Sequence, residues 1–167
     1  MKKGCFLFLL LCLSLVPAFA LGETVLLTAT DLHFIAPTLT DNGALFTRLI
    51  EEADGKVMAY SDALMEAFVS QVIAEQPDAL ILSGDLTFNG ARESHEALAE
   101  KLARIQSAGV PVFVLPGNHD LYSKSAARFE GDGYTRVDGV TAEEFASIYH
   151  AFGSDGALSR DAASLSY

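Results

Sequence analysis

The chain has 167 residues, of which 50% are hydrophobic and 20% are charged, and its 22 acidic side chains outnumber its 11 basic ones. The formal net charge is therefore −11 at pH 7. This composition excludes a disordered chain, and the length is sufficient for one domain with a hydrophobic core. The acidic balance argues against a nucleic-acid-binding surface and against binding to anionic membranes, because both need a basic face.

The first 20 residues have the features of a signal peptide. Lys2 and Lys3 form a positive start, an uninterrupted apolar run follows over residues 5–16, and residues 17–20 end in a small-x-small pattern. A helix over this run would rise about 18 Å, less than the roughly 30 Å of a bilayer core. We therefore predict that residues 1–20 are removed and that the protein is exported (secreted, periplasmic or cell-surface). An uncleaved membrane anchor is the alternative, and only then is a stable membrane partner expected.

Cleavage would change the chemistry that is open to the protein. It would leave 147 residues with 9 basic and 22 acidic side chains, a net charge of −13. Cys5 and Cys12 are the 2 cysteines of the chain, and both would be lost. The mature protein would then have no disulfide and no thiolate ligand, so any metal would be held by His, Asp, Glu and Asn.

The rest of the chain alternates between predicted strands and predicted helices. Apolar, β-branched runs predict strands over residues 24–30, 79–83 and 110–115. The spacing of apolar residues predicts helices over residues 44–52, from the N-cap Ser61 up to Pro77, and over 91–108. In the last of these, Leu98, Leu102 and Ile105 are predicted to face the core. A strand–helix–strand–helix–strand order predicts an α/β fold with a mainly parallel βαβαβ unit.

The segment after the third strand is predicted to be less regular. Residues 122–139 contain three glycines and mixed charges and are predicted to form a loop. Thr141 and Glu144 have the spacing of a capping box, which predicts a further helix that ends near Gly153. Residues 164–167 resemble the opening of another strand.

Metal-binding side chains follow the predicted strands: Asp31 and His33, then Asp85, then Asn118, His119 and Asp120. The carboxyl ends of parallel strands meet at one edge of a sheet, so these side chains should converge. Acidic groups gathered at one edge need a positive partner, and oxygen with imidazole ligands suits Zn, Mn or Fe.

The spacing of these residues indicates how they would act. Asp31 and His33 point the same way in an extended segment, and Asp85 has two oxygens that could bridge two ions roughly 3.5–4 Å apart. His119 could protonate a leaving group or steady a phosphoryl oxygen, with Asp120 orienting its ring.

Each of these residues also has an ordinary structural role. Asp31 could cap a turn, Asp85 could be a helix N-cap, and Asn118 and Asp120 could form an Asx-turn. Their occurrence at three successive strand ends favours the metal site.

Three motifs occur in a characteristic order: Asp31-x-His33, Gly84-Asp85 and Gly117-Asn118-His119-Asp120. Together they resemble the first three blocks of the calcineurin-like metallophosphoesterase superfamily. The resemblance implies an αββα sandwich around a dinuclear centre of divalent or trivalent ions (Mn, Fe or Zn). It implies that Asp31 and His33 bind the first ion, that Asp85 bridges, and that Asn118 binds the second.

The resemblance also implies a reaction. His119 would lie beside the phosphate with Asp120 paired to it, and a metal-bridging hydroxide would attack phosphorus in a small-molecule or nucleotide phosphate ester. The substrate would be a phosphomonoester or a phosphodiester.

The histidines depart from the family pattern, which continues with a later His and a Gly-His-x-His block. The other two histidines of the chain, His95 and His150, lie in no such context, and both are predicted to be solvated helix residues. We therefore predict that residues 21–167 form a phosphoesterase domain that is incomplete at its C-terminus, the N-terminal half of the αββα sandwich. The alternative is a catalytically inactive fragment that at most binds a metal ion weakly.

Overall fold

The computed structural model describes residues 23–52, 57–159, 161 and 163. The predicted signal peptide and the predicted strand over residues 164–167 therefore lie outside the described residues. Among the residues that are described, no helix is long and apolar enough to cross a membrane.

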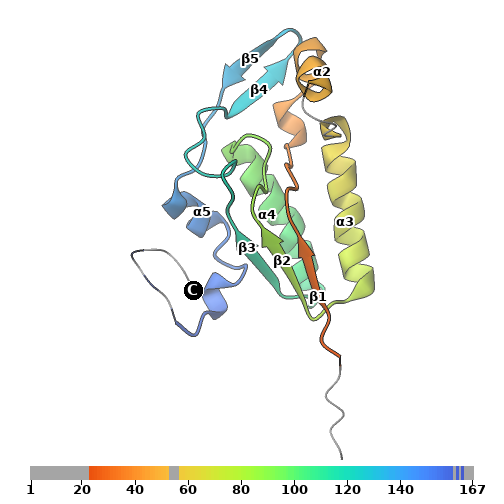
Figure 1. Ribbon diagram of the computed structural model, residues 1–167, viewed down its shortest axis with the longest axis vertical. Helices are drawn as coiled ribbons and strands as arrows, with labels where there is room; N and C mark the ends of the chain where they lie inside the picture. Colours follow the sequence, from red (N-terminus) through yellow and green to blue (C-terminus); the bar gives the residue numbers. More distant parts are fainter. Residues whose placement is uncertain (1–22, 53–56, 160, 162, 164–167) are drawn as a thin grey trace, which may run out of the picture.

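A three-stranded parallel sheet forms the centre of the molecule, as predicted (Figure 1). Its strands are β1 (Leu26–Ala29), β2 (Ala79–Ser83) and β3 (Val112–Leu115), and they lie side by side in that order. In register, Leu27 pairs with Leu80, and Leu82 pairs with Val114. The predicted α/β fold with a parallel sheet is thus confirmed. Because the strands are parallel, their carboxyl ends lie at the same edge of the sheet.

Two long helices make the crossovers between these strands. They are α3 (Ser61–Glu75) and α4 (Arg92–Ser107), and α4 lies behind the sheet in Figure 1. Leu98, Leu102 and Ile105 of α4 are fully buried, as predicted. Lys101 and Arg104 of α4 form ion pairs with Glu66 of α3, which hold the two helices together.

The predicted N-cap role of Ser61 is wrong. Ser61 is the first residue of α3, its N-cap is Tyr60, and the Ser61 hydroxyl instead accepts a hydrogen bond from the Ile35 amide at 3.1 Å. A short 3-10 helix (Met58–Tyr60) leads directly into α3, so the cap position falls one residue earlier. The Ser61 hydroxyl therefore ties the segment after β1 to α3.

The loop predicted over residues 122–139 contains a β-hairpin. Its strands are β4 (Ala127–Glu130) and β5 (Gly133–Arg136), and they pack beside the short helix α2 (Ala44–Glu51) (Figure 1). Gly131 supplies the left-handed backbone, at a φ of 55°, that the two-residue turn needs. The Asp41 carboxylate accepts a hydrogen bond from the Gly131 amide at 2.8 Å. The ring of Phe129 packs against Phe46, with ring centroids 5.2 Å apart.

The last helix, α5 (Ala142–Ile148), begins with the predicted capping box. The Glu144 amide donates to the Thr141 hydroxyl at 3.3 Å, and the Thr141 amide donates to the Glu144 carboxylate at 2.8 Å. The helix ends before Gly153, and short 3-10 segments at Pro37–Leu39 and Ser154–Gly156 complete the described elements. Phe145 and Tyr149 are buried on this side of the molecule, where α5 packs against α4.

Candidate metal centre

Backbone pairing continues beyond the ends of β1 and β2 and sets the position of the first candidate residues. The amide of Asp31 donates to the carbonyl of Gly84 at 3.1 Å, and the amide of His33 donates to the carbonyl of Asp85 at 3.0 Å. The ladder therefore carries the segment after β1 alongside the segment after β2. As a result, the Asp-x-His motif lies next to Asp85.

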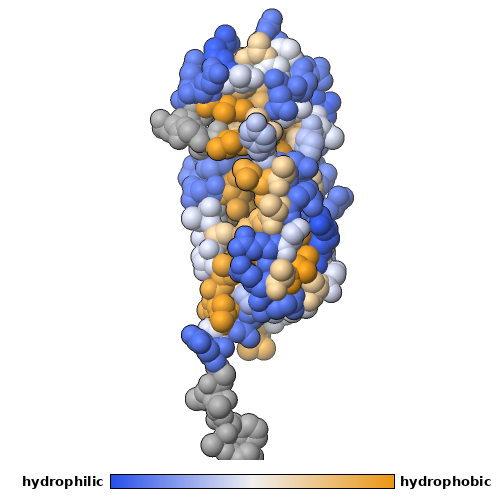
Figure 2. Space-filling view, turned by 90° about the vertical axis from the view of Figure 1, so that its right-hand side faces the viewer, coloured by the Kyte–Doolittle hydropathy of each residue, from blue (hydrophilic) through white to orange (hydrophobic). Residues whose placement is uncertain are grey.

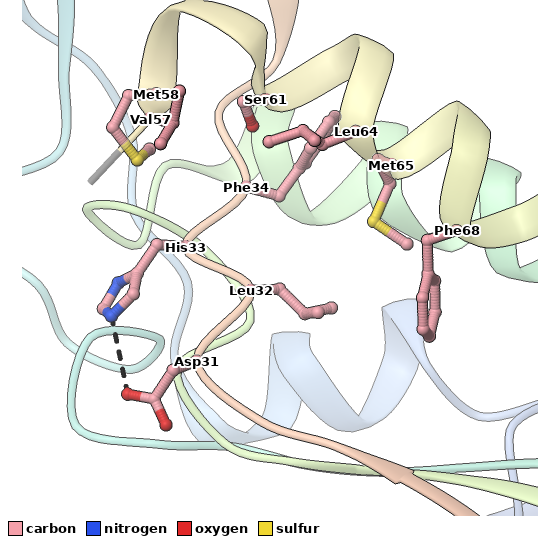
Figure 3. Close-up of a pocket in the computed structure, with 10 residues that line it drawn as sticks. All are labelled: Asp31, Leu32, His33, Phe34, Val57, Met58, Ser61, Leu64, Met65 and Phe68. Atoms are coloured by element: carbon pink, nitrogen blue, oxygen red, sulfur yellow. Dashed lines mark ion pairs between the residues drawn. The ribbon is translucent and has the colours of Figure 1, made fainter. Parts of the chain in front are cut away.

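Three predicted ligands meet at this edge of the sheet. Asp31, His33 and Asp85 each offer one ligand atom such that all three atoms lie within 4.8 Å of one another. Figure 3 shows the side chains of Asp31 and His33 turned to the same side of the chain, with the His33 Nε2 3.6 Å from a carboxylate oxygen of Asp31. His33 is buried, whereas Asp31 is exposed and Asp85 is half-buried. The cluster is thus open to solvent on one side.

The backbone at these three residues is left-handed. The φ angles of Asp31, His33 and Asp85 are 56°, 42° and 48°. Few residues other than glycine adopt this region, although Asp and His tolerate it better than most. Such conformations persist only where the surrounding structure imposes them, and they gather at functional sites. All three candidate ligands therefore carry local strain, which no local sequence motif predicts.

The loop after β3 closes against Asp85. The amide of His119 donates to the Asp85 carboxylate at 3.0 Å, and the rings of His119 and His33 meet edge to face with centroids 4.8 Å apart. Asn118 precedes His119 in the same turn, and its side chain is exposed. Gly117 lies so close to Asp85 that a Cβ atom would come within 2.2 Å of the Asp85 amide nitrogen. The loop therefore needs glycine at this position.

The role predicted for Asp120 as the residue that orients His119 is wrong. The Nδ1 of His119 lies 2.9 Å from the carbonyl oxygen of Phe88. A carbonyl only accepts hydrogen bonds, so Nδ1 carries the proton and the Phe88 carbonyl fixes the ring. In the neutral ring, Nε2 of His119 is left as the basic nitrogen.

Asp120 instead joins two loops from inside the protein. Its side chain is fully buried, and its carboxylate accepts hydrogen bonds from the amides of Leu86, Thr87 and Gly117 at 3.1, 2.9 and 2.7 Å. The hydroxyl of Thr87 donates to it as well, at 2.9 Å. A carboxylate with this many donors is well satisfied despite its burial. Asp120 therefore holds the loop after β2 and the loop after β3 in a fixed relation.

The donor set fits a metal ion. Two carboxylates and one imidazole combine oxygen and nitrogen ligands of the kind that bind Zn, Mn or Fe in proteins. A carboxylate oxygen of Asp31 and one of Asp85 lie within 4.8 Å of each other and of a His33 ring nitrogen. A divalent ion would neutralise both charges, which supports a metal site at this edge.

A family model described as "Calcineurin-like phosphoesterase" matches residues 25–158 of the chain. The chain belongs to this family. The family resemblance predicted from the three motifs is thereby confirmed. A probable cyclic nucleotide phosphodiesterase of Ruthia magnifica subsp. Calyptogena magnifica is 35% identical over 57 residues. These residues are 34% of this chain and 23% of the relative, so the chain matches only about a quarter of the relative's length.

The solvated position predicted for His95 is wrong. His95 is 0% exposed, and its ring contacts Thr87, Asp120 and Tyr149. Burial lowers the pKa of His95 below its ordinary value, with a further lowering by Arg92, and the opposing effect of Asp120 is smaller. Burial also raises the pKa of Tyr149, and the charge of Asp120 adds to the rise. The charged neighbours of His95 in the sequence suggested a surface position, but its spacing from Leu98 places it on the buried stripe of α4.

His150 is exposed, as predicted. Its Nδ1 lies within hydrogen-bond distance of an Asp155 carboxylate oxygen, at 2.8 Å, and both side chains are about 60% exposed. It lies two residues beyond the end of α5, at Ile148, and far along the chain from the candidate ligands.

An apolar hollow lies next to the candidate ligands, between the segment after β1 and α3. It has a volume of about 250 Å³, and Leu32, Met65 and Phe68 line it. Figure 3 shows these side chains on the side of the segment after β1 that faces α3, whereas Asp31 and His33 point away from it. Hydrophobic residues also gather on the outer surface of this side of the molecule (Figure 2). Asp31 and His33 also belong to the lining of this hollow, so it adjoins the candidate ligands directly.

Proposed function

We propose that the protein provides part of a site that hydrolyses phosphate esters with the help of two divalent or trivalent metal ions, and that this part alone supports little turnover. The convergence of Asp31, His33 and Asp85 at the ends of two neighbouring strands supports this proposal most directly. In this proposal Asp31 and His33 bind the first ion, Asp85 bridges both, and Asn118 binds the second. Mn, Fe and Zn are the ions that this donor set suits.

Bound metal ions would lower the pKa of a water molecule and neutralise charge on the phosphoryl group. The protein's own residues would do the rest. Because the Nδ1 proton of His119 is committed to the Phe88 carbonyl, its Nε2 is the nitrogen available to a phosphoryl oxygen or a leaving group. Asp120 would act at a distance, by holding the loop of His119 against the loop of Asp85.

The proposed substrate is a small phosphate ester or nucleotide, either a monoester or a diester. The name of the relative, a probable cyclic nucleotide phosphodiesterase, favours a diester. The net charge of −11 disfavours a long nucleic acid, because a polyanion would be repelled by such a surface.

Binding of inorganic phosphate tests the proposal on the chain as it exists. We expect phosphate to bind only when Mn²⁺ is present and not to bind to Asp85→Asn, as measured by calorimetry. Four proposed ligands are few for two ions, so we expect little or no turnover of bis-p-nitrophenyl phosphate. Absence of phosphate binding by Mn²⁺-loaded wild type would favour the alternative, a fragment that only binds metal weakly. Robust Asp85-dependent turnover would contradict this expectation.

We also propose that the protein is exported through residues 1–20. The expected N-terminus of the mature protein is Leu21. The mature chain would give no reaction with a thiol reagent, since Cys5 and Cys12 are removed. N-terminal sequencing and thiol titration of protein from the cell envelope or medium check this. A retained Met1 with two reactive thiols would instead indicate an uncleaved anchor.

A further inference from the structure

His95 is a fully buried titratable residue that the proposed reaction does not use. Its Nε2 lies 3.1 Å from the carbonyl oxygen of Asp120, and its Nδ1 lies 3.1 Å from the hydroxyl of Tyr149. One imidazole ring of α4 thus contacts both the loop after β3 and the residue that follows α5. The rings of Phe145 and Tyr149 pack edge to face against it, with centroids 5.7 Å away in each case.

The hydrogen-bond partners decide which nitrogen carries the proton. The Asp120 carbonyl can only accept, so Nε2–H is the donor. In the neutral ring Nδ1 is then an acceptor, and the single proton of the Tyr149 hydroxyl is shared between Nδ1 at 3.1 Å and the backbone carbonyl of His95 at 3.3 Å. The ring is therefore held on both sides, and each nitrogen has a complementary partner.

The carbonyl that His95 holds belongs to the loop of the metal centre. Asp120 directly follows His119, whose amide binds the Asp85 carboxylate at 3.0 Å. The side chain of Asp120 fixes this loop to the amides of Leu86 and Thr87. The backbone carbonyl of Asp120 is bound separately by His95 of α4. Removal of the His95 ring would leave the buried Asp120 carbonyl without this hydrogen-bond donor. An unsatisfied buried carbonyl costs free energy, and the loop can reduce that cost only by moving.

We propose that His95 is a positioning residue that holds the loop Gly117–Asp120 in place for metal binding. This inference rests on the proposed function, because it assigns to His95 a task in the same site. It extends the site to α4 and α5, through a chain that runs from Tyr149 over His95 and Asp120 to His119 and Asp85. Partners beyond the first ligands commonly change metal affinity by 10- to 100-fold in proteins.

A set of four variants tests the proposal. His95→Leu removes both hydrogen bonds and keeps most of the volume, His95→Gln keeps a side-chain donor, and Tyr149→Phe removes only the hydroxyl. Leu102→Ala is the matched control, because Leu102 is fully buried on the same face of α4 and contributes no polar contact. The measurements are the dissociation constant for Mn²⁺ by calorimetry and the urea midpoint of the full chain.

We expect His95→Leu to raise the Mn²⁺ dissociation constant about tenfold. His95→Gln should raise it less than threefold, and Tyr149→Phe should give an intermediate value. Leu102→Ala should lower the urea midpoint at least as much as His95→Leu, yet change the dissociation constant less than twofold. The proposal would be overturned if wild type and both His95 variants bound Mn²⁺ with equal affinity. It would also be overturned if the loss of Mn²⁺ affinity simply followed the loss of stability across all four variants. If His95→Leu does not fold, His95→Gln and Tyr149→Phe decide on the same criteria.

A second measurement separates this inference from the proposed function. Amide hydrogen exchange of His119 in metal-free protein reports on the loop without any ion. We expect exchange at His119 to be at least tenfold faster in His95→Leu than in Leu102→Ala, once both are compared at equal global stability. If wild type does not bind Mn²⁺ but this difference is found, only the metal-dependent function fails. If wild type binds Mn²⁺ and the difference is absent, only the role of His95 fails.

Discussion

Replacing Gly117 with alanine is expected to weaken metal binding about 100-fold and to lower the free energy of unfolding by about 3 kcal/mol. An alanine Cβ would lie 2.2 Å from both the amide nitrogen and a carboxylate oxygen of Asp85. No rotamer change relieves a clash with a backbone atom, so the loops after β2 and β3 would have to separate. Calorimetric titration with Mn²⁺ and urea unfolding measure the two effects.

Gly156→Ala is the matched control for Gly117→Ala. A Cβ at Gly156 would meet no atom within 4 Å, so its effect on stability should stay within about 0.5 kcal/mol. Its Mn²⁺ affinity should equal that of wild type. A Gly117→Ala variant that binds Mn²⁺ like wild type would show that the close approach of the two loops is not needed for the site.

Asp85→Asn is expected to weaken Mn²⁺ binding at least 100-fold while leaving the metal-free protein folded. The amide oxygen of asparagine can still accept the hydrogen bond from His119, so the loop keeps its anchor. The charge of the proposed bridging ligand is lost, however, and the ion loses its attraction to it. Wild type should gain about 2.7 kcal/mol of stability at a Mn²⁺ concentration of 100 times the dissociation constant. Asp85→Asn should gain almost none at that concentration, as measured by thermal unfolding with Mn²⁺ and with EDTA.

The control for this charge change is Asp132→Asn, in the exposed turn between β4 and β5. It removes the same charge from the chain at a distance from the cluster, so it corrects for any effect of net charge on cation binding. We expect its Mn²⁺ affinity and its gain in stability to match wild type. Equal Mn²⁺ affinity in Asp85→Asn and Asp132→Asn would remove Asp85 from the set of ligands.

The parallel sheet and the meeting of three candidate ligands could be predicted from the sequence. Apolar β-branched runs define the strands, and residues at the carboxyl ends of parallel strands must share an edge. That reasoning correctly brought Asp31 and His33 next to Asp85. It could not give the left-handed backbone at these residues, because that conformation depends on the pairing between the two loops rather than on any local motif.

Other parts of the site depend on contacts between distant segments. The Gly-Asn-His-Asp motif suggested that Asp120 supports its neighbour His119, but the buried carboxylate turns inward to the loop after β2. Only the fold shows that the Phe88 carbonyl takes the place of Asp120 beside His119. His95 was assigned to the surface by its polar neighbours, whereas tertiary packing against Tyr149 places it in the core.

The hairpin β4–β5 did have a local signal. Gly131, Asp132 and Gly133 lie between two short runs, each of which contains an aromatic residue, and such a pattern is typical of a tight hairpin turn. All four residues of β5 are exposed, so this strand has no buried face. It therefore lacks the alternation of apolar and polar residues that usually predicts a strand. Here the turn residues were a better guide than the hydrophobic pattern.

The backbone ladder that runs from Asp31 to Phe88 has a thermodynamic consequence for metal binding. Because the amides of Asp31, His33 and Phe34 are already bonded to the neighbouring loop, folding of the sheet itself preorganises these ligand positions. An ion that enters the cluster has few backbone torsions left to fix, so little conformational entropy opposes its capture. The affinity of the site would then be set by the number and charge of its ligands, and not by the work of assembling them.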